Sequence, residues 1–242
     1  MPHPHAVTIP RRFNGPLDSG QGGYSAGLVA TFIDGPADVS LRRPVPLDSP
    51  LEVATDGDGD GDGDGTVRLL DGAGLIADGR PASGLEVDVP EPVGLDAARE
   101  ATSRYAGDRE GPFSRCFVCG LARDDGFHVF AGQVAERRVL ASPWTPPAWA
   151  AGDDGVVRPE FVWAALDCPA TFATLLDDDA SLGVLARLRA RIDAPVVAGR
   201  EHVVIGWPMG AEGRKAHAGS AVLAADGSVL AAAQALLITP RT

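Results

Sequence analysis

The chain has 242 residues, of which 45% are hydrophobic, enough for a sizeable core in one domain or in two small ones. The net charge of −12, with almost no lysine, argues against binding nucleic acid or an anionic membrane through bulk electrostatics. No apolar run of about 18 residues predicts a transmembrane helix, and no signal peptide is evident. Three cysteines are too few for a disulfide framework, so we expect a cytoplasmic protein.

In the first half, a glycine-rich start opens a predicted short helix over residues 20–33, GQGGYSAGLVATFI. Short alternating or β-branched apolar runs, broken by Gly, Pro and Asp, then predict strands. An Asp-Gly pair within residues 77–79 predicts a hairpin turn. The repeat DGDGDGDGDG at 56–65 predicts a solvated low-complexity loop and not a calcium site, because it lacks the spacing and closing Glu of an EF-hand.

A connector rich in Pro, Gly and charge follows, with one short predicted helix at 95–105. The second half then repeats the order of the first, with a strand pair in 127–144, a helix over 158–176, and further strands. VSLRRPVPLDSPLEV resembles ARIDAPVVAGREHVVI, and LLDGAGLIADGRPAS resembles HAGSAVLAADGSVLA, with ADG at 77–79 and at 225–227. We therefore predict a duplication: residues 1–92 and 113–242 form the two repeats, and 93–112 form the linker.

One aspartate interrupts the apolar run VRPEFVWAALDCPATFATLL of the second helix. An ionised carboxylate is costly to bury without partners, so Asp167 is either an ordinary solvated residue or is buried for a purpose. The preceding turn, with Trp163 and Ala164, makes its helix face mostly apolar and favours the second alternative. Pro169 removes a backbone hydrogen bond, so we expect it to kink or break the helix near Ala165.

CFVCGLARDDGFHVF, the strand pair after it, and a helix with Asp167 two turns from its start resemble the thioesterase-type hotdog family. The resemblance implies an α+β double hotdog, in which two antiparallel sheets are each wrapped around a central helix. That helix often begins His-Gly-Gly, and the matching positions are Gln21-Gly22-Gly23 in the first half and Arg158-Pro159-Glu160 in the second. The carboxylate position is Ala30 in the first half and Asp167 in the second, so the two halves together complete the pattern.

The resemblance implies an acyl-CoA thioesterase-like hydrolase that needs no cofactor. Hydrolysis requires a hold on the carbonyl oxygen, which a helix N-terminus provides, and a base or nucleophile. We expect one competent site, with a degenerate mirror site at Ala30 and Pro159. Its catalytic residues would be Asp167, Thr171 and Gln21. Its substrate-binding residues would be Asn14, Gly22, Gly23, Trp163, Arg42 and Arg43, the two arginines serving the phosphates of the carrier.

Other interpretations remain open. The absence of His at Gln21, together with Ala30, favours a binding module of the same fold that holds an acyl or aromatic ligand without turnover. A hydratase would need an Asp–His pair, which is not found. Cys116 and Cys119 have the spacing of half a zinc site, but His128 and Cys168 are not at motif spacing, so a structural role is favoured and no metal is expected. The chain is expected to be a monomer with an intramolecular hotdog pair, or a homodimer of it.

Overall fold

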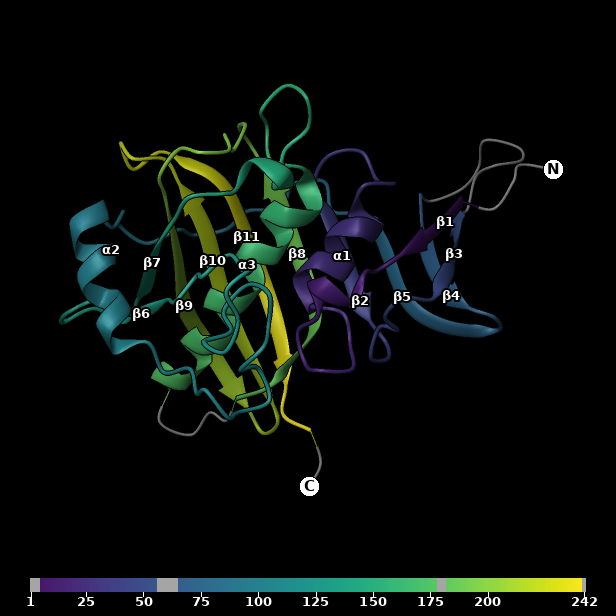
Figure 1. Ribbon diagram of the computed structural model, residues 1–242, viewed down its shortest axis with the longest axis horizontal. Helices are drawn as coiled ribbons and strands as arrows, with labels where there is room; N and C mark the ends of the chain where they lie inside the picture. The colour runs from purple at the N-terminus through teal and green to yellow at the C-terminus, as the bar shows by residue number, and fades with distance from the viewer. Residues whose placement is uncertain (1–4, 56–64, 178–181, 241–242) are drawn as a thin grey trace.

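The computed structural model describes residues 5–55, 65–177 and 182–240 (Figure 1). Within these ranges the helices are α1 (Gly22–Ala30), α2 (Leu95–Ala101) and α3 (Pro159–Ala173), with 3-10 turns at Arg11–Phe13, Thr102–Arg104, Ala148–Ala150 and Thr174–Leu176. The strands are β1 (His5–Thr8), β2 (Ala37–Leu41), β3 (Pro50–Thr55), β4 (Val67–Asp71), β5 (Gly74–Pro81), β6 (Gly132–Gln133), β7 (Leu140–Trp144), β8 (Val184–Ile192), β9 (His202–Glu212), β10 (Lys215–Leu223) and β11 (Val229–Ile238).

The two halves of the chain have the same strand order. In the first half the order is β1-β3-β4-β5-β2, and in the second it is β7-β9-β10-β11-β8, with the short β6 added beyond β7. Every pairing is antiparallel. In each half a helix, α1 or α3, precedes the strand that closes this order. The repeated order of features that the sequence predicts is therefore present in the topology.

The strands form one 11-stranded sheet, where the sequence predicted two. The halves join because β2 pairs with β8, placing Ala37 opposite Ala190 and Val39 opposite Leu188. Pairing satisfies the backbone groups that each edge strand would otherwise expose. The buried Asp38 of β2 strengthens the junction, because its Oδ1 forms a 2.9 Å ion pair with Nε of Arg187 on β8.

The Asp-Gly pair of the first half is not the predicted turn. Residues 77–79 lie inside β5, where Asp78 pairs with the guanidinium of Arg42. The hairpin between β4 and β5 instead turns at Gly72 and Ala73, between the paired Asp71 and Gly74, and Gly72 has a φ of 55°. The second half does turn at Asp226-Gly227, with a φ of 88° at the glycine. The alignment of these segments by their ADG motifs was therefore wrong in register.

Helices α1 and α3 pack closely against each other on one face of the sheet (Figure 1). A β-carbon at Gly23 would lie 2.4 Å from the Trp163 carbonyl oxygen, and one at Gly27 would lie 2.6 Å from the Glu160 α-carbon. Only glycine permits this approach. Gly23 lies against Trp163, and Gly27, one turn later in α1, lies against Glu160, which is earlier in α3. The two helices are therefore antiparallel. The predicted break near Ala165 is wrong, since α3 continues through Pro169 to Ala173.

The segment that the sequence assigned to the linker contains a packed helix. Ala98 and Ala101 of α2 are fully buried, and they join a second apolar cluster with Ala141 of β7 and Ile205 of β9. This cluster lies apart from the main core that contains α1 and α3. The 93–112 segment therefore supplies cover for the second half of the sheet as well as a connection.

Some expectations fall partly outside the described ranges. Residues 56–64 of the Asp-Gly repeat are not described, although the strands that flank it pair with Thr55 opposite Val67. The strand pair predicted in 127–144 is confirmed only as β6 with β7. No helix in the described part of the chain combines the length and apolar character needed to cross a membrane.

Candidate functional site

The N-terminus of α1 forms one side of the site. Gln21 is the N-cap, and its side-chain oxygen accepts the Tyr24 N–H at 2.6 Å. The Gln21 N–H donates to the Phe13 carbonyl at 2.9 Å, and the Ser25 hydroxyl donates to the Gln21 carbonyl at 2.8 Å. These bonds fix a nearly fully buried amide whose remaining donor, Nε2, points across to α3.

Asp167 of α3 receives that donor. Its Oδ2 accepts the Gln21 Nε2 at 2.6 Å and the Gly23 N–H at 2.8 Å, and its Oδ1 accepts the Thr171 hydroxyl at 3.0 Å. Thr171 reaches it because residues four apart lie on the same helix face. The carboxylate is thus held between the helices of the two halves, as the comparison of the halves predicts.

The electrostatic state of Asp167 follows from its burial. Asp167 is only 5% exposed, and desolvation raises its pKa from 3.8 to about 7. The Gly23 N–H and the Thr171 hydroxyl act in the opposite direction, since both stabilise the ionised form. A buried carboxyl with a pKa shifted towards neutrality is typical of groups that transfer protons.

A pocket of about 400 Å³ opens beside this carboxylate. Polar groups at its wall include Gln21, Asp167 and Thr171. Much of the remaining lining is apolar, from both halves and the Cys116 loop: Leu41, Val45, Phe113, Phe172, Leu185 and Ile238. Such a pocket, mostly apolar with few polar groups, is the usual form of a small-molecule site.

Gly22 lines this pocket, and its N–H is the remaining donor of the first turn of α1. The Gly23 N–H bonds to Asp167 and the Tyr24 N–H bonds to Gln21. No acceptor for the Gly22 N–H is found among the described residues. We expected Gln21 and Gly23 to donate to a substrate carbonyl, whereas in the structure both donate to the carboxylate. The helix N-terminus therefore offers one free N–H at the pocket wall, at Gly22.

Two of the predicted substrate-binding residues do not line the pocket. The Asn14 amide donates to the carbonyls of Gly15 and Arg115, at 3.1 Å each, and its oxygen accepts from Arg123 at 3.0 Å. These contacts tie the loop of the first half to the loop that carries the CxxC motif. Trp163 is buried between α1 and α3, so it contributes to packing.

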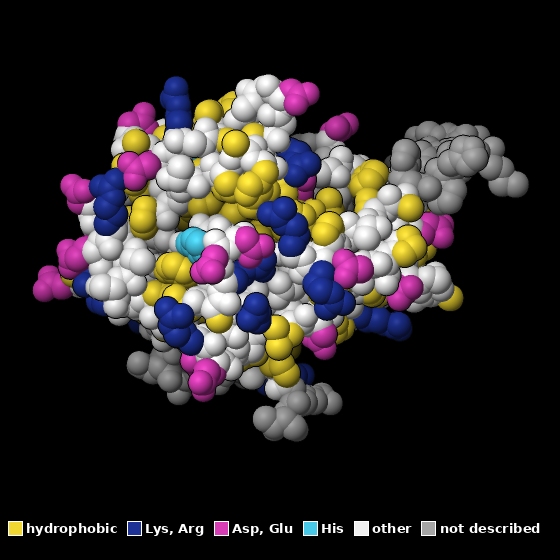
Figure 2. Space-filling model, in the orientation of Figure 1, with side chains coloured by type: hydrophobic (Ala, Val, Ile, Leu, Met, Phe, Trp, Pro, Cys, Tyr) yellow, Lys and Arg dark blue, Asp and Glu magenta, His cyan; other side chains and the backbone are white. Residues whose placement is uncertain are grey.

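The two predicted arginines do line the pocket. Arg42 is engaged through a two-pronged ion pair with Asp78. Arg43 is exposed, and no ion pair of Arg43 is found within the described ranges. On the face of the molecule that Figure 2 shows, the basic side chains are dispersed among acidic ones and form no continuous patch.

The mirror-related site, at Ala30 and the start of α3, has different side chains. Arg158 pairs with Glu160 at 3.3 Å, and Pro159 provides no N–H at the first turn of α3. Aromatic rings pack nearby, with Phe161 5.3 Å from both Phe13 and Tyr24 between ring centroids. Ala30 carries no carboxylate. Of the two matched positions, Ala30 and Asp167, only Asp167 therefore places a carboxyl group at the wall of the pocket.

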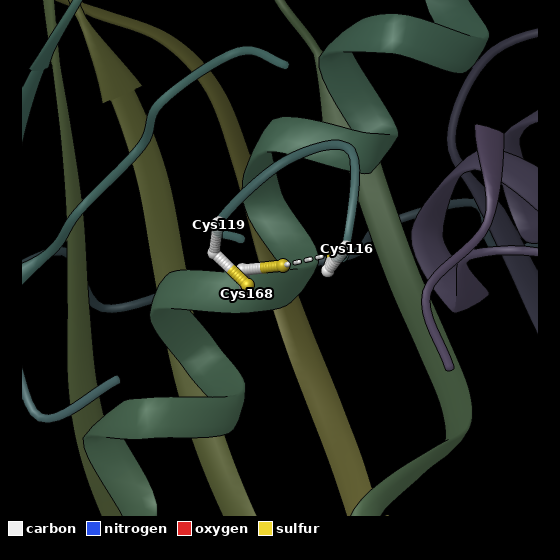
Figure 3. Close-up of side chains that lie close together, drawn as sticks. All are labelled: Cys116, Cys119 and Cys168. Atoms are coloured by element: carbon white, nitrogen blue, oxygen red, sulfur yellow. Dashed lines mark hydrogen bonds between the residues drawn. The ribbon is translucent and has the colours of Figure 1, made fainter. Parts of the chain in front are cut away.

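Three cysteines form a cluster at the same pocket that the sequence did not predict. Cys116 and Cys119 come from the loop before β6, and Cys168 comes from α3, next to Asp167 (Figure 3). Their sulfurs lie within 4.8 Å of one another, all three are buried, and all are free thiols. The CxxC spacing indicated two of these three cysteines. Cys168 had no spacing signal, because the fold brings it there from about 50 residues away.

The fold is shared with solved structures that match nearly the whole chain. A proposed thioesterase of Novosphingobium aromaticivorans is 14% identical with a TM-score of 0.64, over 98% of this chain and 95% of that one. A proposed thioesterase II of Thermobifida fusca is 15% identical with a TM-score of 0.61, over 98% and 93%. A hotdog-fold protein of Alicyclobacillus acidocaldarius is 11% identical with a TM-score of 0.57, over 98% and 93%.

These comparisons confirm the hotdog fold that the sequence resemblance predicts. The identities are low, so the likeness concerns the fold. No family model matches the sequence, and no curated protein matches it.

Proposed function

We propose that this chain hydrolyses the thioester of an acyl-CoA or a related carrier, with Asp167 as the base or nucleophile. One observation carries the proposal: the Asp167 carboxylate lies at the wall of a largely apolar pocket and is held by Gln21 and Gly23 at the start of the opposite helix. A carboxylate beside a helix N-terminus combines the two requirements of acyl transfer, a base and a donor for the developing oxyanion.

The residues divide the chemistry in a specific way. The Gly22 N–H, aided by the α1 dipole, would donate a hydrogen bond to the carbonyl oxygen of the thioester. In the general-base route, Asp167 takes a proton from water as the water oxygen bonds to the carbonyl carbon. The carbon–sulfur bond then breaks, and the proton passes to the departing thiolate. Gln21 and Gly23 position the carboxylate, and Thr171 fixes its other oxygen.

The acyl chain and the carrier would occupy different parts of the pocket. Leu41, Val45 and Leu185 offer apolar surface to an acyl group. Arg43, without an ion pair among the described residues, is the better candidate for a carrier phosphate, because Arg42 is already paired with Asp78. An arginine binds phosphate through a rigid fork of donors.

The architecture that we propose is a double hotdog in one chain. The repeated strand order supports two repeats at residues 1–92 and 113–242 with the linker at 93–112. Because α1 and α3 already complete a two-helix arrangement, we infer that the chain is active as a monomer. Light scattering of the purified protein, combined with activity at the same concentration, tests this part.

A binding module is the second candidate. Both oxygens of Asp167 already accept hydrogen bonds from protein groups, which would restrain the carboxylate from taking a proton. In that case the pocket would hold an acyl thioester without turnover.

The deciding experiment measures turnover of short, medium and aromatic acyl-CoAs by the wild type and by Asp167→Asn. Asparagine can still accept from Gln21 and Gly23 through its oxygen and contact Thr171 with its amide, so the fold should persist. We expect hydrolysis by the wild type and a loss of at least about 100-fold in the variant. Unchanged turnover in a folded variant would exclude Asp167. Thermal stabilisation by free CoA or an acyl-CoA without any turnover would favour the module.

A further inference from the structure

All the cysteines of the chain meet at one place. The sequence contains three, and Cys116, Cys119 and Cys168 are free and buried within the described structure. Figure 3 shows Cys168, from α3, pointing toward the loop that carries the other two. None of the three takes part in the proposed hydrolysis, so their convergence needs a separate explanation.

The separation of the sulfurs fits a shared metal ion. Zinc binds cysteine sulfur at about 2.3 Å, and a tetrahedral arrangement then places two ligand sulfurs about 3.8 Å apart. The sulfurs of Cys116 and Cys168 are 3.8 Å apart, and no sulfur of the three is more than 4.8 Å from another. The third sulfur therefore needs a shift of at most about 1 Å, within the reach of a side-chain rotation.

Backbone donors surround the Cys116 sulfur. The N–H groups of Cys119 and Val118 both form hydrogen bonds to it. Backbone donors to sulfur are the outer-shell contacts that stabilise a metal-bound thiolate. The turn also requires Gly120, since a β-carbon there would lie 2.6 Å from the Cys116 carbonyl oxygen.

Further contacts hold the other two ligands. The Tyr105 hydroxyl donates to the Cys119 carbonyl at 2.9 Å, which fixes the loop. The Gln21 amide lies 3.7 Å from the Cys168 sulfur. The same Gln21 that holds Asp167 is thus an outer-shell neighbour of the cysteine cluster.

We propose that Cys116, Cys119 and Cys168 bind one thiophilic d10 metal ion, with Zn²⁺ the expected ion. Three sulfurs, with no oxygen or nitrogen ligand in the group found among the described residues, select a soft ion over Mg²⁺ or Ca²⁺. Zn²⁺ offsets more of the thiolate charge beside Asp167 than Cu⁺ does. Because all three cysteines line the pocket, the fourth coordination position would face it, as in zinc sites with three protein ligands. The proposal does not depend on thioester hydrolysis.

The test begins with metal analysis of the full chain purified without chelator under reducing conditions. We expect about one zinc per chain by mass spectrometry. The apoprotein is then titrated with Co²⁺, whose thiolate charge-transfer absorption reports sulfur ligands, and in a separate arm with Cu⁺ under anaerobic conditions. Zinc should also protect all three cysteines from alkylation, a readout that does not depend on activity.

The variants Cys116→Ser, Cys119→Ser and Cys168→Ser should each weaken Co²⁺ and Zn²⁺ binding by at least about 100-fold, because even outer-shell changes cost about 10–100-fold. Thr171→Val is the matched control, since it lies on the same helix and pocket but carries no ligand, and its metal binding should equal that of the wild type. If a serine variant unfolds, protection of the wild-type thiols still decides the question.

Binding of Cu⁺ in preference to Zn²⁺ would support the site and change the ion. Three outcomes would overturn the proposal: a reduced wild type that binds none of these ions, metal binding that survives all three serine substitutions, or cysteines that zinc leaves open to alkylation. A stable disulfide within the cluster in the freshly isolated protein would also overturn it.

Discussion

The Asp167 carboxylate accepts a 2.8 Å hydrogen bond from the Gly23 N–H across 144 residues of sequence. The bond joins helices from different halves of the chain. Its geometry depends on the close contact of α1 with α3, so small changes in that contact should alter both stability and chemistry.

Gly23→Ala tests this contact directly. The added carbon would lie 2.4 Å from the Trp163 carbonyl and 2.6 Å from the Asp167 β-carbon, so the helices must separate. We expect a loss of about 1–3 kcal/mol in the free energy of unfolding, measured with urea, and a loss of any hydrolytic activity. Gly94→Ala is the control, because nothing lies within 4 Å of the new carbon there, and it should cost less than about 1 kcal/mol. Equal effects at the two positions would contradict the steric argument.

Asp167→Asn should leave the protein at least as stable as the wild type. The ionised carboxylate is buried at the cost of its hydration, and asparagine preserves its shape and partners without that charge. Thermal unfolding followed by circular dichroism should give an unchanged or higher Tm, while hydrolysis is lost. A Tm well below that of the wild type would mean that the charged form contributes to the fold.

Thr171 is expected to act through the carboxylate that it contacts at 3.0 Å. Thr171→Val removes the donor with little change of volume and should lower kcat by about 10-fold or more while KM changes little. Thr171→Ser keeps the hydroxyl and should restore most of kcat. If serine and valine behave alike, the hydroxyl has no positioning role.

Arg43 and Arg42 should differ in their effect on carrier binding. Arg43→Ala should raise KM for acyl-CoA by about 10-fold but leave KM for a pantetheine thioester, which lacks the nucleotide phosphates, almost unchanged. Arg42→Ala should have the smaller effect, since Asp78 already occupies its guanidinium. Equal KM changes for both substrates would exclude a phosphate contact at Arg43.

We expect the buried His202 to make the protein less stable in mild acid. Burial lowers its pKa below 6.5, because the folded chain disfavours the charged imidazole. The unfolded chain binds the proton first, so the free energy of unfolding is fully present above about pH 6.5 and falls as the pH drops towards the folded pKa. Urea unfolding at pH 7.5 and 5.5 measures the fall, and His202→Gln should reduce it. An identical difference between the two pH values in wild type and variant would exclude His202 as its source.

The sequence predicts the parts of the fold that local pattern controls. Both helices of the site, the repeated order of elements and the meeting of Gln21 with Asp167 follow from helix signals and from comparing the halves. The Asp-Gly signal misplaced the first-half hairpin, because Gly79 serves another purpose: a β-carbon there would lie 2.9 Å from Val29 of α1. A dipeptide cannot distinguish a turn glycine from one that makes room for a helix.

Long-range pairing explains the remaining differences. The joining of the halves through β2 and β8 depends on two edge strands meeting, which neither strand encodes alone. Cys168 was set aside because its sequence distance from Cys116 and Cys119 matched no ligand spacing. The role of Gly23 changed for a similar reason, since only the packed helices show that its N–H is taken by the carboxylate.

The repeated strand order lies within a single polypeptide, so matched positions in the two halves can change independently. In an assembly of identical subunits, any substitution would appear at both equivalent positions. Here Asp167 and Ala30 are separate codons, so one position can keep a costly buried acid while the other is free of that burden. In the same way, Cys168 follows Asp167 on α3 only, while aromatic rings such as Phe161 pack at the mirror-related site.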